Sequence, residues 1–181
     1  MEATRLELPE VMLLKPRVFG DERGYFFESY NARAFREATG LDVTFVQDNH
    51  SYSKAAVLRG LHYQVQQAQG KLVRVVAGAV FDVAVDLRRK SPSFGRWVGV
   101  RLSADEQTML WIPPGFAHGF FVVSEGAEFL YKTTDYWAPA HERTLLWSDP
   151  DLDIAWPSTR SPVVNAKDAA GLPLARAEVY D

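Results

Sequence analysis

Several ionisable side chains lie at positions where the short strands of this sequence should carry apolar residues. Arg59 and His62 flank a leucine in one run, Lys71 begins the next run, His118 follows a Pro-Pro-Gly turn, and Tyr131 lies mid-strand. Burying such groups without partners costs roughly 2–7 kcal/mol each, so packing alone rarely accounts for them. Imidazole, ammonium, guanidinium and phenol groups can bind anions or exchange protons. We therefore predict that these strands line a polar site.

Each of these residues also has a structural explanation when it is considered alone. A single His is more often a hydrogen-bonded structural residue than a catalyst, and a single Tyr usually packs with its hydroxyl bonded. Lys71 alone would be a solvated strand end, Asp168 alone a helix cap, and Trp137 alone a core residue. The site is favoured because the structural explanation requires several coincidences on separate strands.

Common metal-binding and nucleotide-binding motifs are absent from the sequence. It contains no cysteine, no HExxH, no phosphate-binding loop and no G-x-S-x-G. A metal-binding double-stranded β-helix usually offers His-x-His followed by a carboxylate. Here the matching segment is His62-Tyr63-Gln64, and no carboxylate follows before Gly70. With two of the expected ligands missing, we expect no bound metal.

The composition is that of an ordinary globular chain. With 181 residues, of which 47% are hydrophobic and 24% charged, we expect one domain over residues 1–181. The net charge of −3 and the lack of a Lys/Arg stripe argue against a nucleic-acid partner. No signal peptide or bilayer-length apolar run is visible, so the sequence predicts no membrane association and a cytoplasmic location.

Short strands dominate the predicted secondary structure. We expect strands at residues 25–30, 44–50, 57–64, 71–76, 79–87, 97–102, 108–112, 118–123 and 128–134, separated by turns rich in Gly and Pro. A helix is predicted at residues 32–39, with Asn31 as its cap and Gly40 as its end, and a short one near residues 166–170. Such a pattern favours an all-β sandwich or barrel with a few short helices, whose interior can hold a ligand.

Taken together, these segments resemble a known family, the dTDP-4-dehydrorhamnose 3,5-epimerases, over nearly the whole chain. The resemblance rests on residues 19–28, 45–51, 58–64, 70–74, 81–86, 113–120 and 131–137. It implies an all-β, cupin-type jelly-roll fold, also called a double-stranded β-helix. It also implies an isomerase that uses no cofactor and acts on a dTDP-sugar, a 4-keto-6-deoxyhexose carried on thymidine diphosphate.

The resemblance implies proton transfer next to the sugar ketone. The C–H bonds at C3 and C5 are acidic because both carbons neighbour the C4 carbonyl, and inversion requires a base and an acid on opposite faces of the ring. His62 matches the family's base, Tyr131 its acid, and Lys71 the cation that stabilises the enolate. Asp168 resembles the carboxylate that orients His62, and Asp82 is a rival for that role.

The family pattern also implies residues that hold the nucleotide and the sugar. Those around the carrier are Arg23, Glu28, Gln47, Asn49, Arg59, His118, Glu142 and Lys167. Phe26 and Trp137 are candidates for stacking on the base, although much of the family has Tyr at the second position. Arg and Lys side chains suit the diphosphate, and Arg59 either binds it or assists Lys71.

Other functions remain open from the sequence. A 3-epimerase, which acts at one carbon only, would have nearly the same motif residues. A non-catalytic cupin that binds a sugar nucleotide has no need of base, acid and cation together, and the missing ligands disfavour a metal-dependent cupin oxygenase. The resemblance further implies a homodimer in which the N-terminal strand near residues 5–8 is exchanged between subunits.

Overall fold

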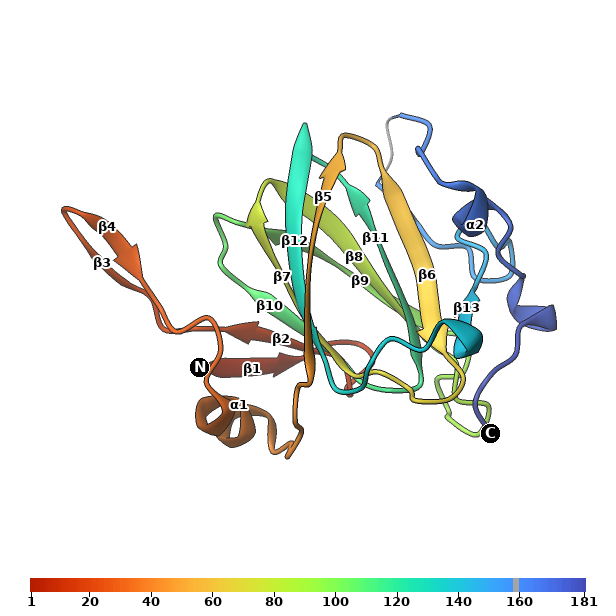
Figure 1. Ribbon diagram of the computed structural model, residues 1–181, viewed down its shortest axis with the longest axis horizontal. Coiled ribbons are helices and arrows are strands. Elements are labelled where there is room, and N and C mark those ends of the chain that lie inside the picture. The colour runs from red at the N-terminus through yellow and green to blue at the C-terminus, as the bar shows by residue number, and fades with distance from the viewer. Residues whose placement is uncertain (158–159) are drawn as a thin grey trace.

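Two antiparallel β-sheets face each other in the computed structural model, which describes residues 1–157 and 160–181 (Figure 1). The larger sheet has the order β1 (Glu2–Arg5), β2 (Met12–Lys15), β10 (Met109–Ile112), β7 (Lys71–Ala77), β12 (Gly126–Thr133) and β5 (Gln47–Lys54). The smaller sheet has the order β13 (Glu142–Thr144), β6 (Leu58–Gln64), β11 (Phe116–Val122), β8 (Ala79–Asp86) and β9 (Trp97–Ser103). Strands distant in the sequence are neighbours in each sheet, as in a jelly roll.

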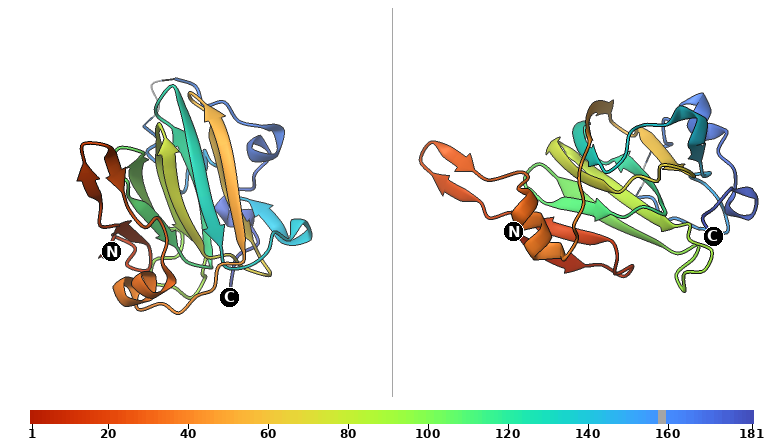
Figure 2. Two further views of the ribbon diagram at one scale, coloured as in Figure 1. Left: turned by 60° about the vertical axis from the view of Figure 1, so that its left-hand side comes forward. Right: turned by 60° about the horizontal axis from the view of Figure 1, so that its bottom comes forward.

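A hairpin of β3 (Phe19–Asp21) and β4 (Gly24–Phe26) projects from one end of the sandwich (Figures 1 and 2). The helical elements are α1 (Ala32–Thr39), α2 (Ala166–Ala169) and the short 3-10 turns η1 (Pro139–His141) and η2 (Leu174–Arg176). In the described part of the chain, no helix has the length and apolar character needed to span a bilayer. The arrangement confirms the predicted all-β fold with a few short helices.

The inward faces of the two sheets pack into one apolar core. Val73 and Phe129 come from the larger sheet, and Phe120 from the smaller one stacks on Phe129 with ring centroids 4.3 Å apart. Lys71 and Tyr131 lie two positions from Val73 and Phe129, so strand alternation directs them to the same inner side. The polar site therefore lies directly beside the apolar core, on the inner side of the same strands.

Helix α1 forms where the sequence predicts it. Asn31 Oδ1 accepts hydrogen bonds from two N–H groups of the first turn, and Gly40 ends the helix in the left-handed region at a φ of 74°. Phe35 is buried beneath the helix, where its ring lies 5.6 Å from Trp111 and 5.7 Å from Phe45. This aromatic cluster attaches the helix to the outer side of the larger sheet.

Two predicted strands have different boundaries in the structure. The strand expected at residues 25–30 ends already at Phe26, because the chain then turns into α1, where Glu28 accepts a hydrogen bond from Asn31 Nδ2 at 3.0 Å. The strand expected at residues 44–50 begins at Gln47 and continues to Lys54, because it pairs with β12 along its whole length. The other predicted strands agree to within a residue or two, whereas the short strands β1, β2, β3 and β13 were missed.

The chain after β13 covers the outer face of the smaller sheet (Figure 2). Leu152 joins an apolar cluster there that includes Tyr63. Two tyrosine hydroxyls fix the end of the chain to β6: Tyr63 donates to the carbonyl of Glu178 at 2.7 Å, and Tyr180 donates to the carbonyl of Gln64 at 2.6 Å. These contacts hold the segment that carries α2.

Replacing Phe35 by Ala should lower the free energy of unfolding by about 3–5 kcal/mol, because it leaves a cavity in the aromatic cluster beneath α1. Urea unfolding followed by circular dichroism would measure the loss. Glu37→Ala, on the exposed side of the same helix, is the matched control and should change stability by less than about 0.5 kcal/mol. Equal losses in the two variants would mean that Phe35 does not anchor the helix.

Candidate active site

A cavity opens between β5 of the larger sheet and β6 of the smaller sheet. Figure 1 shows where these two strands lie in the sandwich. It consists of two adjoining hollows of about 260 and 290 Å³, which share Asn49, His62, Lys71 and Tyr131. These four residues come from β5, β6, β7 and β12 respectively. The structure therefore brings together polar residues from separate strands, as the sequence predicted.

An irregularity at Gly60 brings Arg59 and His62 to the same side of β6. Regular alternation would place residues 59 and 62 on opposite faces. Gly60 has a left-handed φ of 126°, and a Cβ there would lie 2.6 Å from the Cα of Gly119 on β11. The register of the β6–β11 pair also shifts at this point. Arg59 consequently points toward β5, where its Nε donates to Ser53 Oγ at 2.8 Å, and it lines the cavity beside His62.

His62 is held by a buried carboxylate from the C-terminal segment. Its Nε2 donates to Asp168 Oδ1 at 2.6 Å, and Asp168 is fully buried. Burial disfavours the charge on Asp168, but hydrogen bonds from His62 and from the N–H of Gly60 outweigh it and hold the pKa of this carboxyl below its usual value. Asn165 caps α2 by accepting from the N–H of Asp168. The bond to Asp168 fixes the imidazole tautomer and leaves Nδ1 as the basic nitrogen of the ring.

Asp82, the rival partner for His62, is bonded to a different histidine. Both of its oxygens lie 3.0 Å from Nε2 of His118, and the carboxylate is fully buried. Burial lowers the pKa of His118 despite the opposing charge of Asp82, so this ring is neutral at pH 7. His118 and His62 are direct neighbours across the β6–β11 pair. His62 and His118 thus each have their own carboxylate, and Asp168 is the one bonded to His62.

Lys71 and Tyr131 face the histidines from the larger sheet. Lys71 is only 8% exposed, and burial lowers the pKa of its ammonium to about 8, although the charges of Asp82 and Glu142 oppose this. Its Nζ lies 3.5 Å from the backbone oxygen of His62. Burial and the nearby charge of Glu142 raise the pKa of Tyr131, so the phenol keeps its proton at neutral pH.

Several residues expected to bind a nucleotide lie at the mouth of the cavity. Trp137 is at the rim and 58% exposed, and its backbone N–H donates to Gln47 Oε1 at 3.1 Å. Glu142 lines the same hollow and forms an ion pair with Lys167 at 2.6 Å. Trp137, Gln47 and Asn49 thus offer an aromatic face and amides to one ligand in this hollow, and Lys167 lies beside it through its pair with Glu142.

Two glutamines complete the wall and were not predicted as site residues. Gln64 is buried, donates to the carbonyl of Tyr136 and accepts from the N–H of Ala138, so it positions the segment that carries Trp137. Gln69 also lines the cavity. The signal for Gln64 was its shared face with His62, whereas Gln69 lies outside the strands, where alternation gives no information.

Metal ligation has no obvious set of donors here. Within residues 1–157 and 160–181, no three His, Cys, Asp or Glu side chains gather in a way that could hold a metal ion. At the position where a metal-binding cupin would offer its second histidine, both ends of the Gln64 amide are bonded to backbone groups.

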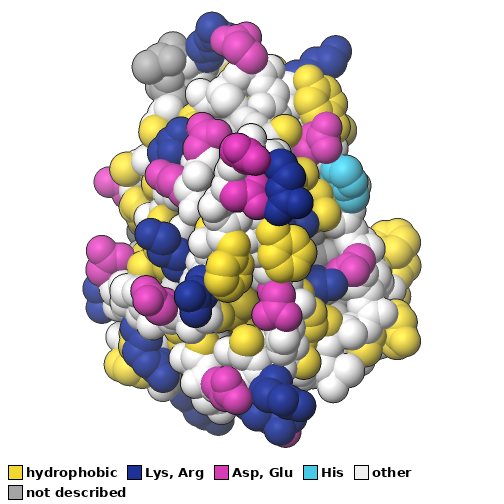
Figure 3. Space-filling view, turned by 90° about the vertical axis from the view of Figure 1, so that its left-hand side faces the viewer, with side chains coloured by type: hydrophobic (Ala, Val, Ile, Leu, Met, Phe, Trp, Pro, Cys, Tyr) yellow, Lys and Arg dark blue, Asp and Glu magenta, His cyan; other side chains and the backbone are white. Residues whose placement is uncertain are grey.

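Arg23, Phe26 and Glu28 do not line the cavity of their own chain. Arg23 and Phe26 lie on the projecting hairpin, where Arg23 pairs with Asp21 and Phe26 is 67% exposed. Figure 3 faces this end of the molecule and shows apolar side chains at its surface among charged ones. Glu28 lies between the hairpin and α1, bonded to Asn31. Strand β1, near the segment expected to be exchanged between subunits, pairs with β2 of the same chain.

Comparisons with known proteins identify the family. The profile of the family described as dTDP-4-dehydrorhamnose 3,5-epimerase matches residues 5–176. The chain belongs to this family. A dTDP-4-dehydrorhamnose 3,5-epimerase from Pseudomonas aeruginosa is 64% identical to it over 180 residues, which cover 99% of each chain. The epimerase of the same name from Salmonella typhimurium is 58% identical over 171 residues, which cover 94% of this chain and 93% of the relative.

The solved structures agree with this assignment. A crystal structure of dTDP-6-deoxy-D-glucose-3,5-epimerase from Legionella pneumophila, in complex with dTDP-4-keto-L-rhamnose, matches this chain with a TM-score of 0.95 and 49% identity. The match covers 98% of this chain and 94% of the other. The sandwich is therefore the cupin-type jelly roll of the 3,5-epimerases, as the sequence predicted, and the protein belongs to a family of isomerases acting on sugar nucleotides.

The bond between His62 and Asp168 should make this epimerase less stable in acid. The folded chain holds the pKa of Asp168 below the ordinary 3.8, so the ionised carboxylate contributes stability that is present above that value and lost as the pH falls through the folded pKa. Asp168→Asn should therefore show a flatter dependence of unfolding free energy between about pH 5 and pH 2. Urea unfolding at a series of pH values measures this, and parallel curves for the two proteins would contradict it.

Proposed function

We propose that this protein inverts C3 and C5 of dTDP-4-keto-6-deoxy-D-glucose, as the 3,5-epimerase of dTDP-L-rhamnose biosynthesis. The observation that carries the proposal is the convergence of the His62–Asp168 pair, Lys71 and Tyr131 on one cavity. Relatives that are 64% and 58% identical are named for the double epimerisation, which favours this reaction over that of a 3-epimerase. We also propose a cytoplasmic location, which the lack of cysteine fits.

In the proposed mechanism His62 is the general base. Its Nδ1 removes the proton from the carbon next to the ketone, and the ring becomes an imidazolium. Asp168 accepts the Nε2 hydrogen bond throughout and stabilises the positive charge that develops. Because general-base catalysis typically contributes about 10²–10⁴ in rate, loss of His62 should abolish most of the activity.

Lys71 then stabilises the enolate. Loss of the proton leaves negative charge on the oxygen at C4, and an ammonium beside that oxygen lowers the barrier. Since Lys71 is almost fully buried, its charge acts in a medium that screens it much less than water does. Arg59 lines the same hollow and either supports this charge or holds a phosphate.

Tyr131 is the proposed acid that returns the proton. Its phenol is protonated at neutral pH, because burial raises its pKa. His62 belongs to the smaller sheet and Tyr131 to the larger one, so the two groups approach the cavity from opposite sheets. This placement suits an inversion, in which the proton leaves one face of the sugar and returns on the other.

The carrier would occupy the mouth of the cavity. We assign the exposed face of Trp137 to stacking on thymine, with Gln47 and Asn49 nearby as hydrogen-bonding groups. Lys167 supplies positive charge for the diphosphate, which is also one of the two roles open to Arg59. The proposed chemistry requires only proton transfer, and it uses neither a redox cofactor nor a metal.

We further propose that the active protein is a homodimer in which each hairpin completes the site of the other subunit. Arg23, in the turn between β3 and β4, and Phe26, on β4, are expected to bind substrate, yet their hairpin projects away from the rest of its own chain (Figure 1). Phe19 and Tyr25 of the same hairpin are 51% and 64% exposed, an apolar surface that contact with a second copy would cover.

Deuterium exchange separates the proposed base from the proposed acid. His62→Ala should lose both solvent exchange at C3 and C5 and product formation. Tyr131→Phe keeps the base, so it should still exchange substrate protons for deuterium when the His62 proton equilibrates with solvent, while forming little inverted product. NMR of dTDP-4-keto-6-deoxyglucose incubated in deuterated water reads both quantities, and label at C3 alone would indicate a 3-epimerase. Full inversion by Tyr131→Phe at the wild-type rate would exclude Tyr131 as the acid.

Mixed dimers test the shared site. In a dimer of one His62→Ala chain and one Arg23→Ala/Phe26→Ala chain, one site has an intact cavity and the other subunit's intact hairpin. Random mixing should therefore restore about a quarter of the wild-type activity, although each parent homodimer is nearly inactive. Activity equal to the mean of the two parents after subunit exchange would show that each hairpin serves its own chain.

A further inference from the structure

Asp82 is a fully buried carboxylate that takes no part in the mechanism above. Among the described residues, its one hydrogen-bonding partner is Nε2 of His118, whose ring is neutral at pH 7. A buried carboxylate without a cation in contact is costly, because it has lost its hydration and gained little in return. His118 lines the same hollow as Lys71, so the carboxylate bonded to this ring lies directly behind the cavity wall.

The other carboxylates at the cavity already have charged or hydrogen-bonding partners. Asp168 is bonded to His62, and Glu142 forms an ion pair with Lys167 at 2.6 Å. Lys71 has the opposite deficiency: across the ranges the structure describes it forms no ion pair, and its ammonium lies 3.5 Å from a backbone oxygen. A buried anion and a buried cation are thus each left without a direct partner of opposite charge.

The ionisable groups around Lys71 line the cavity or lie directly behind its wall. Those that line it are His50 on β5, Arg59, His62 and Tyr63 on β6, His118 on β11, Tyr131 on β12 and Glu142 on β13. Behind the wall, Asp82 on β8 is bonded to His118, Asp168 on α2 is bonded to His62, and Lys167 is paired with Glu142. His50 is bonded to Glu128. Of the charges near Lys71, that of Asp82 stabilises the ammonium most, ahead of Glu142, whose effect is opposed by Lys167.

We propose that Asp82 is the counter-ion that keeps Lys71 positively charged inside the cavity, and that it thereby sets the upper pH limit of the epimerase reaction. This rests on the proposed function, in which Lys71 is the cation that stabilises the enolate. Asp82 acts through Lys71 and does not itself contact the substrate, so it is a positioning residue. Its bond to His118 also holds that ring with Nε2 protonated.

The direction of the pH effect follows from the burial of Lys71. Only the protonated ammonium stabilises the enolate oxygen, and burial lowers the pKa of Lys71 to about 8, so activity should decline as the pH rises through that value. Removing the charge of Asp82 removes the strongest interaction that opposes burial. The pKa of Lys71 then falls further, and activity declines from a lower pH. A single opposite charge at close range shifts a pKa by roughly one unit or more.

The variant Asp82→Asn tests this directly. Asn keeps the shape of the side chain and an oxygen that accepts from His118, so it removes the charge alone. NMR titration of the full-length protein with labelled lysine, without substrate, gives the pKa of Lys71 once its signal is assigned by its absence in Lys71→Arg. We expect the pKa to fall by about one unit from the wild-type value, and the alkaline limb of kcat to move down with it. Because the titration needs no substrate, its result stands whether or not the catalytic roles are correct.

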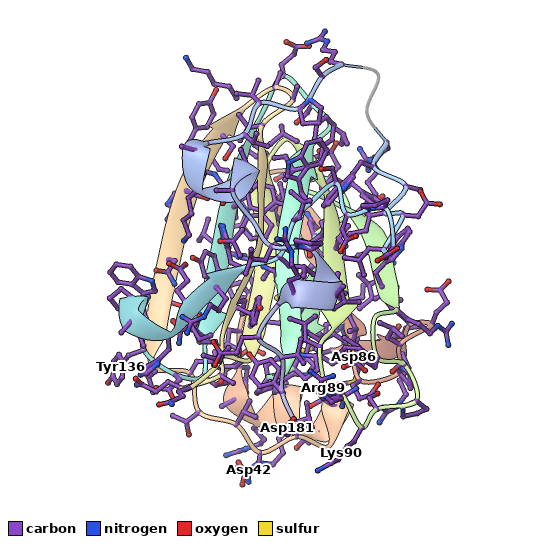
Figure 4. All side chains as sticks on the ribbon, turned by 90° about the vertical axis from the view of Figure 1, so that its right-hand side faces the viewer. Asp42, Asp86, Arg89, Lys90, Tyr136 and Asp181 are labelled. Atoms are coloured by element: carbon purple, nitrogen blue, oxygen red, sulfur yellow. The ribbon has the colours of Figure 1, made fainter. Side chains whose placement is uncertain are left out.

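Asp86→Asn is the matched control. Asp86 is also fully buried on β8, but it pairs with Arg88 at 2.8 Å and lies at the strand end beside Arg89 and Lys90 (Figure 4). This variant should leave the pKa of Lys71 unchanged. Asp82→Glu keeps the charge and should keep the pKa near the wild-type value, and Asp82→Ser removes the charge in case the Asn variant does not fold. An unchanged pKa in the charge-removing variants, or an equal fall in Asp82→Glu, would overturn the proposal.

Discussion

The hydrogen bond between His62 and Asp168 joins a strand of the sandwich to a segment that lies outside it. The two residues are 106 positions apart, so Asp168 reaches His62 only when α2 is docked at the edge of β6. Backbone bonds on both sides of α2 hold it there: the N–H of Leu58 donates to the carbonyl of Val163, and the N–H of Leu172 donates to the carbonyl of Thr144. The pairing of the C-terminal segment with the smaller sheet therefore determines the tautomer of a base on its inner face.

Strand alternation explains which parts of this site are predictable from sequence. Lys71 and Tyr131 are in phase with core residues, so their inward direction follows from the period of two. The phase of Arg59 does not follow, because the left-handed backbone at Gly60 reverses the alternation within β6. Asp82 and Asp168 are both fully buried, and only the distance from each carboxylate to His62 shows which of them is its partner. Local sequence patterns contain no information about distances between segments that are far apart in the chain.

The segment at residues 19–28 shows another limit of sequence reasoning. Its family resemblance indicated a role in binding, but the sequence pattern predicted a strand only at residues 25–30 and not the hairpin of β3 and β4. Neither could say what surface its aromatic residues would cover, since within one chain Phe19 and Phe26 remain largely exposed. Which surface covers an exposed apolar patch depends on how the subunits assemble, so it depends on the sequences of both chains together.

The buried amide of Gln64 has a consequence for how this fold can change its chemistry. Its oxygen and nitrogen hold the backbone on either side of Trp137, so the side chain works as a clamp on the rim of the cavity. A histidine at this position cannot ligate a metal and also bond the backbone at Tyr136 and Ala138. A first substitution toward metal binding would loosen the rim before any metal chemistry was gained. A Gln64→His substitution would therefore exchange a backbone clamp for one possible metal ligand, so the geometry of the rim and metal binding compete for the same position.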